Sequence, residues 1–270
     1  MRAIVCLKQV IDPLTPATSL VLDADAKKIR AAASAPPVIN GFDEQGLEGA
    51  LRLREAMGGL EIICLAAGDR FNNDVMKRVL AVGADQLVLV QATSLDTWNS
   101  YPIAATLAAA IRHLGGADLV ICGRQGSDWD NGLVPYILAE TLGMPMLTLA
   151  KRMTVTGGNR IEIERVLSDG SVLMQADLPA VVTVTSELGP LRMPTVAARL
   201  SAARKQPRIL PLADLDVVAP AGSAPEVTSL AVPVTGRACT FIAAMDGLSA
   251  GARLAETLWD AGIIPPGRKS

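Results

Sequence analysis

The stretch ICGRQGSDWDNGLVPYILAETLG, residues 121–143, places a strand, a turn and a helix in immediate succession. An apolar run ends at Gly123, a polar turn follows, and a helical pattern ends at Gly143. The sequence contains four short, continuous apolar runs. They are residues 2–7, 61–66, 86–90 and 118–123, the last of which ends in this stretch. Such runs are typical of parallel strands that helices cover on both faces.

Helical patterns separate these runs, at residues 42–57, 72–83, 101–116 and 131–143. Alternating strands and helices predict right-handed crossovers and a three-layer αβα fold with a mostly parallel sheet. Beyond Pro145 the pattern changes, because residues 151–178 alternate around GG and DG turns and predict a β-hairpin or meander. We expect a nucleotide-binding α/β domain at 1–190. An arm at 191–270 follows, with a linker at 219–236 and a last helix at 249–264.

The composition narrows the class of function. The chain has 270 residues, of which 50% are hydrophobic and 3% aromatic, and its net charge is −2. A near-neutral chain with few aromatic residues gives no reason to expect nucleic acid as a partner. It lacks a membrane-spanning apolar run and a signal-peptide pattern, so we expect a soluble, cytoplasmic protein.

Cysteines and the single histidine give little sign of catalysis. Cys6, Cys64, Cys122 and Cys239 form no CxxC pair. Buried reduced thiols are the simple interpretation, and a metal site of three thiolates is the alternative. His113 lies near a helix end and is expected at the surface. Without an acid–base constellation, the sequence favours a binding or electron-carrying protein over a hydrolase.

The turns that follow the predicted strands are the candidate site. In open parallel sheets, ligands bind outside the carboxyl ends of the strands. Gly68, Gly123 and Gly126 allow the backbone to approach a ligand, and Asn131 and Gly132 lie near a helix start that favours phosphate. The alternative is that Ser127, Asp128 and Asp130 only cap the helix. Walker A and GxGxxG motifs are both absent.

A second candidate is PPVINGFDEQGLEGA, residues 36–50. Asp43 is either the N-cap of the following helix or a functional side chain. Phe42 stands just before that helix, where its ring could touch a flat ligand.

Six stretches together resemble the β subunits of electron transfer flavoproteins, including the Fix-type subunits. They are RAIVCLKQVID (2–12), INGFDEQGLEGALRLRE (39–55), VLAVGADQLVLV (79–90), ADLVICGRQGSD (117–128), LPAVVTVTSEL (178–188) and MPTVAARLSAARKQP (193–207). The resemblance implies a fold like that of adenine-nucleotide-binding stress proteins. It also implies an α-subunit partner that holds most of the FAD.

In ordinary members of this family the β subunit holds a structural AMP. In electron-bifurcating members a second FAD takes that place. The heterodimer accepts electrons from flavin dehydrogenases and passes them on, commonly toward a membrane quinone reductase. The resemblance therefore implies an electron carrier without a substrate of its own. Two alternatives remain open: a bifurcating subunit that binds FAD and NADH, and a free-standing stress-type protein.

The resemblance also assigns residues. It implies nucleotide contacts at Cys6, Asn40, Gly41, Phe42, Asp43, Ala67, Gly68, Gly123, Arg124, Gln125, Gly126, Ser127, Asp128, Asp130, Asn131, Gly132, Leu133 and Val134, with no catalytic or metal-binding residue. Phe42 matches an aromatic residue that approaches the α-subunit flavin. Met193 and Pro194 match a loop that docks partner dehydrogenases, and Arg199, Arg204 and Lys205 follow where the family is basic. The arm and last helix match segments that wrap onto the α subunit.

Several positions depart from the family pattern. Leu133, Val134 and Pro135 stand where ordinary members have Gln-Thr-Gly, and Pro135 removes a backbone donor. Trp129 replaces the glycine of the Asp-Gly-Asp run of bifurcating members. Asn40-Gly41-Phe42 replaces the Asn-Pro-Phe of the family, and Pro13 occupies a position where ordinary members commonly have a tyrosine. The sequence therefore predicts an adenine nucleotide and leaves AMP and FAD as alternatives.

Overall fold

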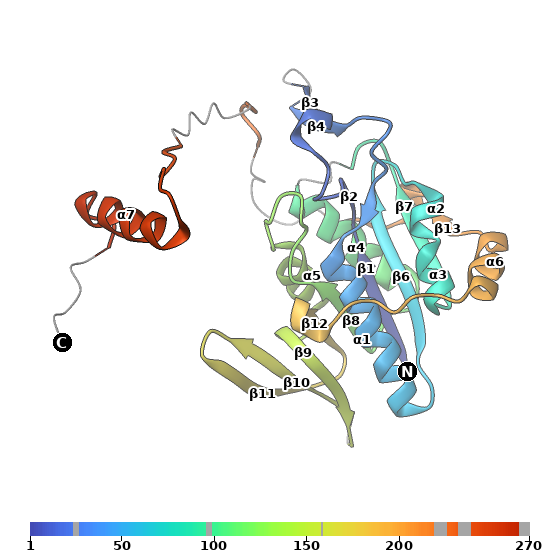
Figure 1. The fold of residues 1–270 in the computed structure, drawn as a ribbon. Helices are drawn as coiled ribbons and strands as arrows, with labels where there is room; N and C mark the ends of the chain where they lie inside the picture. The colour runs from blue at the N-terminus through green and yellow to red at the C-terminus, as the bar shows by residue number, and fades with distance from the viewer. Residues whose placement is uncertain (24–26, 96–98, 158, 219–225, 232–238, 265–270) are drawn as a thin grey trace. The chain divides into compact units, whose positions relative to one another are not determined.

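A computed structural model describes residues 1–23, 27–95, 99–157, 159–218, 226–231 and 239–264. Its centre is a nine-stranded sheet in the order β11-β10-β9-β12-β8-β1-β6-β7-β13 (Figure 1). The four predicted strands are present as β1 (Arg2–Leu7), β6 (Glu61–Gly68), β7 (Gln86–Gln91) and β8 (Leu119–Gly123). β12 (Ala180–Val184) and β13 (Arg208–Leu210) add further parallel pairs.

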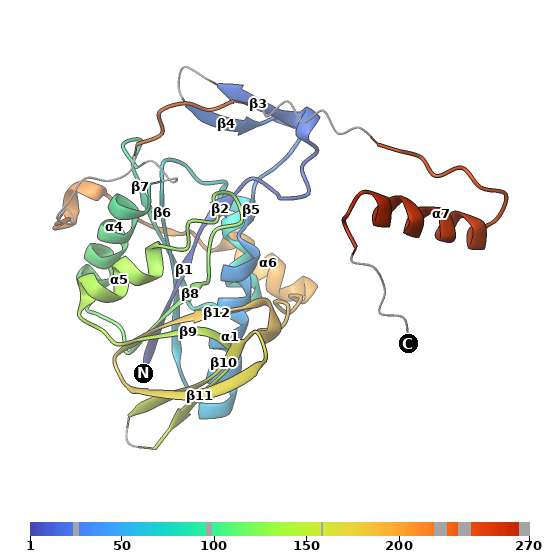
Figure 2. The same cartoon turned by 90° about the vertical axis from the view of Figure 1, so that its left-hand side faces the viewer.

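Helices cover both faces of the sheet, which confirms the three-layer prediction (Figure 2). One face carries α1 (Gly41–Met57), α2 (Asn73–Met76) and α3 (Arg78–Val82), whose apolar side chains join one core cluster. The other face carries α4 (Ser100–His113) and α5 (Val134–Leu142), which form a second cluster. The central strands are buried on both faces, which explains why their sequences read as continuous apolar runs.

Two glycines allow α1 to lie close to the sheet. A Cβ at Gly46 would lie 3.2 Å from Cγ2 of Ile121, and one at Gly49 would clash with Met153 and lie 3.0 Å from Cδ1 of Leu188. A larger residue at either position would require these side chains to shift, although glycine in a helix costs about 1 kcal/mol relative to alanine. This close packing sets the distance between α1 and the sheet. The first turn of α1 belongs to the site described below.

The predicted meander is confirmed at one edge of the sheet. β9 (Met146–Thr156) pairs in parallel with β12, and β10 (Arg160–Leu167) and β11 (Gly170–Asp177) extend it antiparallel. Two small antiparallel pairs were not predicted: β2 (Gln9–Val10) with β5 (Val38–Ile39), and β3 (Leu20–Asp23) with β4 (Lys28–Ala31).

The chain forms two compact units, 1–230 and 231–270. We expected the arm to begin at residue 191, but α6 (Val196–Arg204) packs against α3, and β13 pairs with β7. The segment up to residue 218 therefore belongs to the first unit. The predicted linker lies largely outside the described residues. The second unit contains the predicted last helix as α7 (Gly247–Asp260). Among the described residues, no helix is long and apolar enough to cross a membrane.

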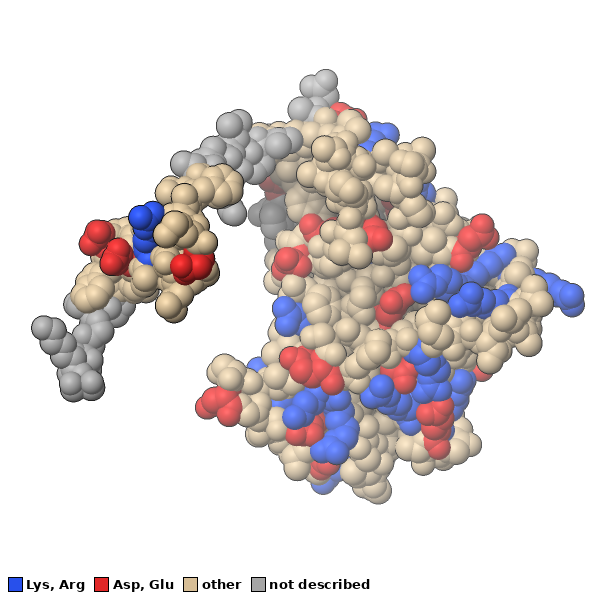
Figure 3. Space-filling view, viewed as in Figure 1, with Lys and Arg blue, Asp and Glu red and all other residues tan. Residues whose placement is uncertain are grey.

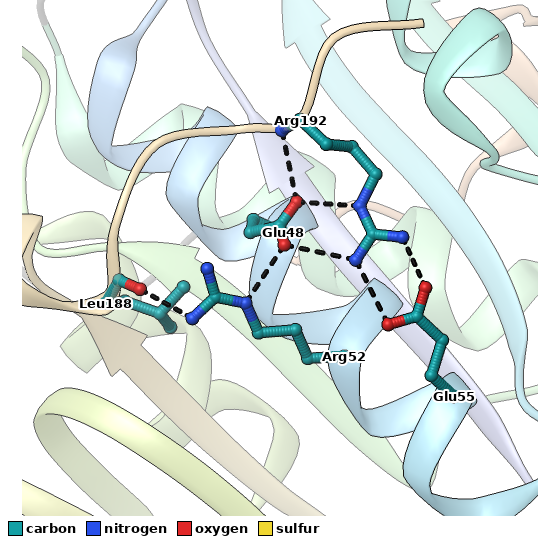
Figure 4. A network of polar contacts seen from close by, with 5 residues as sticks. All are labelled: Glu48, Arg52, Glu55, Leu188 and Arg192. Carbon is teal, nitrogen blue, oxygen red and sulfur yellow. Dashed lines mark hydrogen bonds and ion pairs between the residues drawn. The ribbon is translucent and has the colours of Figure 1, made fainter.

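A network of charged side chains ties α1 to the segment before α6 (Figure 4). The carboxylate of Glu48, only 4% exposed, accepts hydrogen bonds from Nε of Arg52 and from the backbone N–H, Nε and Nη2 of Arg192. Arg192 also pairs with Glu55, and Arg52 donates to the carbonyl of Leu188 at 2.7 Å. Burial opposes the charge of Glu48, but the hydrogen bonds from Arg192 and Arg52 outweigh it and lower its pKa.

This network predicts a stability effect of Arg192→Ala. The variant leaves the buried Glu48 carboxylate with only Arg52, so we expect the free energy of unfolding to fall by about 2–3 kcal/mol at pH 7. Because the folded state lowers the pKa of Glu48, the difference from wild type should shrink as the pH falls below the ordinary glutamate value.

Urea unfolding of the full chain at several pH values measures the effect. Arg199→Ala, at an exposed position of α6, is the matched control and should change stability little. Equal losses for the two variants would mean that the network contributes nothing specific.

Candidate functional site

The candidate site lies where the order of the strands reverses. β1 pairs with β6 on one side and with β8 on the other, so the crossovers after β1 and β8 leave the sheet in opposite directions. In open α/β sheets the crevice at such a point is the usual ligand site. Its floor is formed by the last residues of β1 and β8, by the turns that follow them and by the start of α1.

A cavity opens at this point and encloses about 700 Å³, part of it open to solvent. Its lining comes from the ends of β1, β6 and β8, the start of α1, the first two turns of α4, and the turn into α5. The residues are Cys6, Leu7, Lys8, Asn40, Asp43, Ala67, Ser100, Ile103, Leu107, Cys122, Gly123, Gln125, Gly126, Asp128, Trp129, Asp130, Asn131, Gly132, Leu133, Val134 and Pro135.

Asp43 joins the three elements that form the floor. Its Oδ2 accepts the backbone N–H of Lys8 at 2.7 Å, and its Oδ1 accepts the backbone N–H of Gly123 at 3.1 Å. Gly123 must be a glycine, because a Cβ there would clash with the Asp43 carboxylate and lie 2.9 Å from the carbonyl carbon of Phe42. The N-cap of α1 is Asn40, so Asp43 is not the cap but a cross-link between the ends of β1 and β8.

Burial gives Asp43 an unusual acidity. Desolvation raises its pKa to about 7, although hydrogen bonds from Lys8, Asn40 and Gly123 and the charge of Lys8 act in the opposite direction. The carboxyl group therefore changes its charge near neutral pH, at the centre of the site.

Asn40 shapes the turn after β8. Its side chain is 1% exposed, donates from Nδ2 to the carbonyl of Gln125 at 2.8 Å and accepts the N–H of Ser127 at 3.2 Å. Both bonds join the start of α1 to the turn after β8. Asn40 is therefore a structural member of the site as well as part of its lining.

The two aspartates of the turn are held by side chains and do not cap α5. Nζ of Lys8 pairs with Asp128 at 2.7 Å, and Nε2 of Gln125 donates to Asp130 at 2.7 Å. The N-cap of α5 is Leu133, which makes no side-chain capping bond, so the capping alternative is wrong. The hydroxyl of Ser127 is buried and has no hydrogen-bond partner among the described residues.

Most of the residues assigned by resemblance come together in the cavity, but five do not line it. Gly41, Phe42, Gly68, Arg124 and Ser127 lie outside the lining. The guanidinium of Arg124 instead stands 4.9 Å from the centre of the Phe42 ring, a cation–π contact on the outside of the same turn.

Sequence reasoning missed part of the apolar wall. Ser100, Ile103 and Leu107 have the spacing of one helix face, and this face could have been matched to the site from the pattern of α4. Leu7, Lys8 and Cys122 belong to or directly follow strand ends already assigned to it. Trp129 and Pro135 were noted only as departures from the family pattern.

The cysteines agree with the simpler prediction. Cys6, Cys64 and Cys122 are buried free thiols, and Cys239 is exposed. A hydrogen bond with Cys6 and burial raise the pKa of Cys122 well above its usual value, and burial raises the pKa of Cys64 as well. No cluster of three potential metal ligands occurs in the part of the chain that the structure describes. The cavity therefore offers a binding surface and no activated nucleophile.

The acidity of Asp43 predicts a pH dependence of folding. Between about pH 4 and pH 7 the unfolded chain has lost this proton while the folded chain keeps it. The free energy of unfolding should therefore fall with rising pH by up to about 1.4 kcal/mol per pH unit from this group. In Asp43→Asn this contribution should be absent, so the stability difference between variant and wild type should change steadily across that window.

Urea unfolding from pH 4 to pH 8 measures this difference. Asp169→Asn, at an exposed turn, is the control and should follow the wild-type dependence. Parallel curves for Asp43→Asn and wild type would contradict the assignment.

Comparison with known proteins identifies the family of the chain. A model of the electron transfer flavoprotein domain matches residues 29–215. The electron transfer flavoprotein subunit beta of Mycobacterium tuberculosis (strain ATCC 25618 / H37Rv) is 32% identical over 218 residues, 79% of this chain and 80% of that protein. Its counterpart in Thermoanaerobacterium thermosaccharolyticum is 30% identical over 243 residues, 88% of this chain and 90% of that protein.

A third relative is the caffeyl-CoA reductase-Etf complex subunit CarD of Acetobacterium woodii. It is 29% identical over 206 residues, 75% of each chain. The family match covers both segments that form the floor of the cavity beyond β1, namely the start of α1 and the turn after β8. The chain therefore belongs to the electron transfer flavoprotein family and is similar to its β subunits.

Proposed function

We propose that the chain is the β subunit of a heterodimeric electron transfer flavoprotein and holds an adenine nucleotide, AMP or FAD, in the cavity at the strand reversal. The observation that carries the nucleotide assignment is the cavity itself, which lies at the point where open α/β sheets bind nucleotides. Electrons would pass from flavin dehydrogenases to an acceptor such as a quinone reductase.

The lining suits a nucleoside. Ile103, Leu107 and Ala67 offer an apolar wall for a base, and Gly123 and Gly126 let the backbone approach a ribose. Asn40 and Gln125 add amides at the turn, although the Asn40 amide already donates to the carbonyl of Gln125 and the Gln125 amide to Asp130. The fit supports an adenine nucleotide as a buried structural ligand.

The residues of the cavity support an electron carrier more than an enzyme with its own substrate. The thiol of Cys122 stays protonated because its pKa is raised, and the Asp43 carboxyl is committed to two backbone donors. A flavin held with the partner subunit would supply the reversible electron transfer. This chain would then provide positioning, exclusion of water and fixed charges.

Met193 and Pro194 are proposed to dock the partner dehydrogenase. The Met193 side chain is 75% exposed, and it follows Arg192, which the Glu48 network anchors to α1. Val196 and Leu200 on α6 are exposed as well, at 74% and 64%. Lys and Arg side chains gather over α6 in Figure 3. An exposed apolar knob on an anchored segment is suited to a small transient interface.

A second candidate function is that of an electron-bifurcating subunit of a larger reductase complex. In that case this chain would bind FAD. The similarity to the CarD subunit of a caffeyl-CoA reductase-Etf complex favours considering it. The free-standing stress-type alternative loses support, because the reported relatives are named as subunits.

The first test is to identify the bound nucleotide. The full chain is co-expressed with an α subunit, the purified heterodimer is denatured, and the released nucleotides are identified and counted. One FAD with one AMP supports the ordinary carrier, and two FAD supports the bifurcating alternative. One FAD alone would mean that this chain holds no nucleotide.

A matched pair of variants assigns the nucleotide to this cavity. Leu133→Trp fills the mouth of the cavity, so the second nucleotide should fall to a tenth of its wild-type content or less. Tyr136→Trp, one turn further along α5, lies outside the lining and is similarly exposed. It should retain the wild-type content. Loss of nucleotide in both variants would indicate disturbance of α5 and not occlusion of the site.

Docking is tested by Met193→Asp in the heterodimer. A buried charge in the interface should raise the KM for reduction by a flavin dehydrogenase at least tenfold, with nucleotide content unchanged. Leu14→Asp, 88% exposed elsewhere on the first unit, is the control. An unchanged KM for Met193→Asp would place the docking surface elsewhere.

A further inference from the structure

Two cysteines lie side by side at the floor of the cavity, on the two strands between which the sheet reverses. β1 and β8 pair in parallel, with Val5 opposite Ile121. One step further along, the same register places Cys6 opposite Cys122. Both side chains belong to the second core cluster, so they point to the same face of the sheet. Paired strands lie about 4.8 Å apart, which allows the two Sγ atoms to approach one another.

The two thiols are in contact with each other and face the cavity. A hydrogen bond joins the thiols of Cys6 and Cys122. The two residues are only 6% and 3% exposed, yet both line the cavity. A buried free cysteine usually packs as a small apolar residue. This pair differs, because two sulfur donors meet at a space that opens to solvent, and the proposed electron carrier makes no use of them.

The other two cysteines are not part of this pair. Cys64 on β6 lies opposite Val5, one step before Cys6, and its side chain belongs to the first core cluster on the other face of the sheet. Cys239 is exposed and belongs to the second unit. The floor of the cavity therefore carries two sulfur donors, one from each of two neighbouring strands.

Harder donors are not available to complete a larger metal site. Oδ1 and Oδ2 of Asp43 accept backbone N–H groups, and Asp128 pairs with Lys8. His113, the single histidine of the chain, is the last residue of α4, whereas the cavity meets the first two turns of that helix. Among the described residues, no three potential metal ligands come together.

This donor set selects the kind of ion. A structural zinc ion takes four ligands in a tetrahedral arrangement, and magnesium and calcium take oxygen ligands. Two sulfur donors without a third ligand fit neither class. Soft thiolate ligands select copper(I) among the common metal ions. The pair is therefore suited to a soft ion that is satisfied by two sulfur atoms.

We propose that Cys6 and Cys122 form a two-sulfur binding site for a soft monovalent cation, of which copper(I) is the representative, at the floor of the cavity. One ion replaces the protons of the two thiols, so that a bis-thiolate complex forms and two protons pass to solvent. Neither sulfur nor metal changes its oxidation state. The inference goes beyond the proposed electron carrier and is independent of the nucleotide, because it needs only the two strand ends.

The experiment titrates the heterodimer of the full chain and its α subunit with copper(I). The ion is held by a coloured chelator, without oxygen and without added thiols, and the loss of colour at equilibrium counts the copper transferred to protein. All samples carry Cys239→Ala, so that the exposed thiol does not contribute. This reference protein should bind one copper more per heterodimer than either Cys6→Ala or Cys122→Ala, because each of these variants lacks one of the two donors.

Cys64→Ala is the matched control, since it removes a buried cysteine from the neighbouring strand on the other face of the sheet. It should bind as much copper as the reference protein, and unfolding temperatures check that each variant is folded. X-ray absorption of the reference protein should show more sulfur neighbours around copper than in Cys122→Ala.

Two results would overturn the inference. Copper retained by both Cys6→Ala and Cys122→Ala would mean an adventitious ion only. Equal loss of copper in Cys64→Ala would mean that loss of a buried thiol disturbs the protein as a whole. Both results leave the proposed nucleotide function untouched, since that function is tested by the nucleotides released from the heterodimer.

Discussion

The carboxyl group of Asp43 is the constraint on which the site depends. It accepts N–H groups from the ends of β1 and β8, the two strands between which the sheet reverses. Without such a bridge the two strand ends would present unpaired donors at the floor of the cavity. The bridge works only because Gly123 leaves room for it, so this pair of residues ties the start of α1 to the ends of both strands. The bridge requires the carboxyl group to be buried, and this burial raises its pKa.

α1 connects the candidate cavity to the proposed docking segment. Its N-cap and first turn provide Asn40 and Asp43, and Glu48 and Glu55 further along the helix hold Arg192. Gly46 and Gly49 keep the same helix close to the sheet. A single rigid element thus sets the geometry of two surfaces that are far apart in the sequence, at residues 123–135 and 189–195. The proposed electron carrier needs this rigidity, since its contribution is positioning.

The departures from the family pattern gain a physical meaning from the cavity. Leu133 and Pro135 offer fewer polar contacts at the start of α5 than the residues they replace, and Pro135 lacks a backbone donor. Trp129 lines the cavity and adds an aromatic wall. The altered turn is therefore more apolar at the start of α5 than the family pattern.

The sequence alone determined the layers of the fold and most of the site. Continuous apolar runs and helical periodicity identified the four strands of the centre and the helices between them, because both patterns follow from local geometry and burial. The turns after the strands pointed to the site for the same reason. Only the tertiary structure decided that Asp43 bridges two strands instead of capping a helix, and that α6 and β13 belong to the first unit. It also decided which side of α4 faces the cavity. These features join residues about 35 to 120 positions apart, and long-range pairs leave no period or spacing in the sequence.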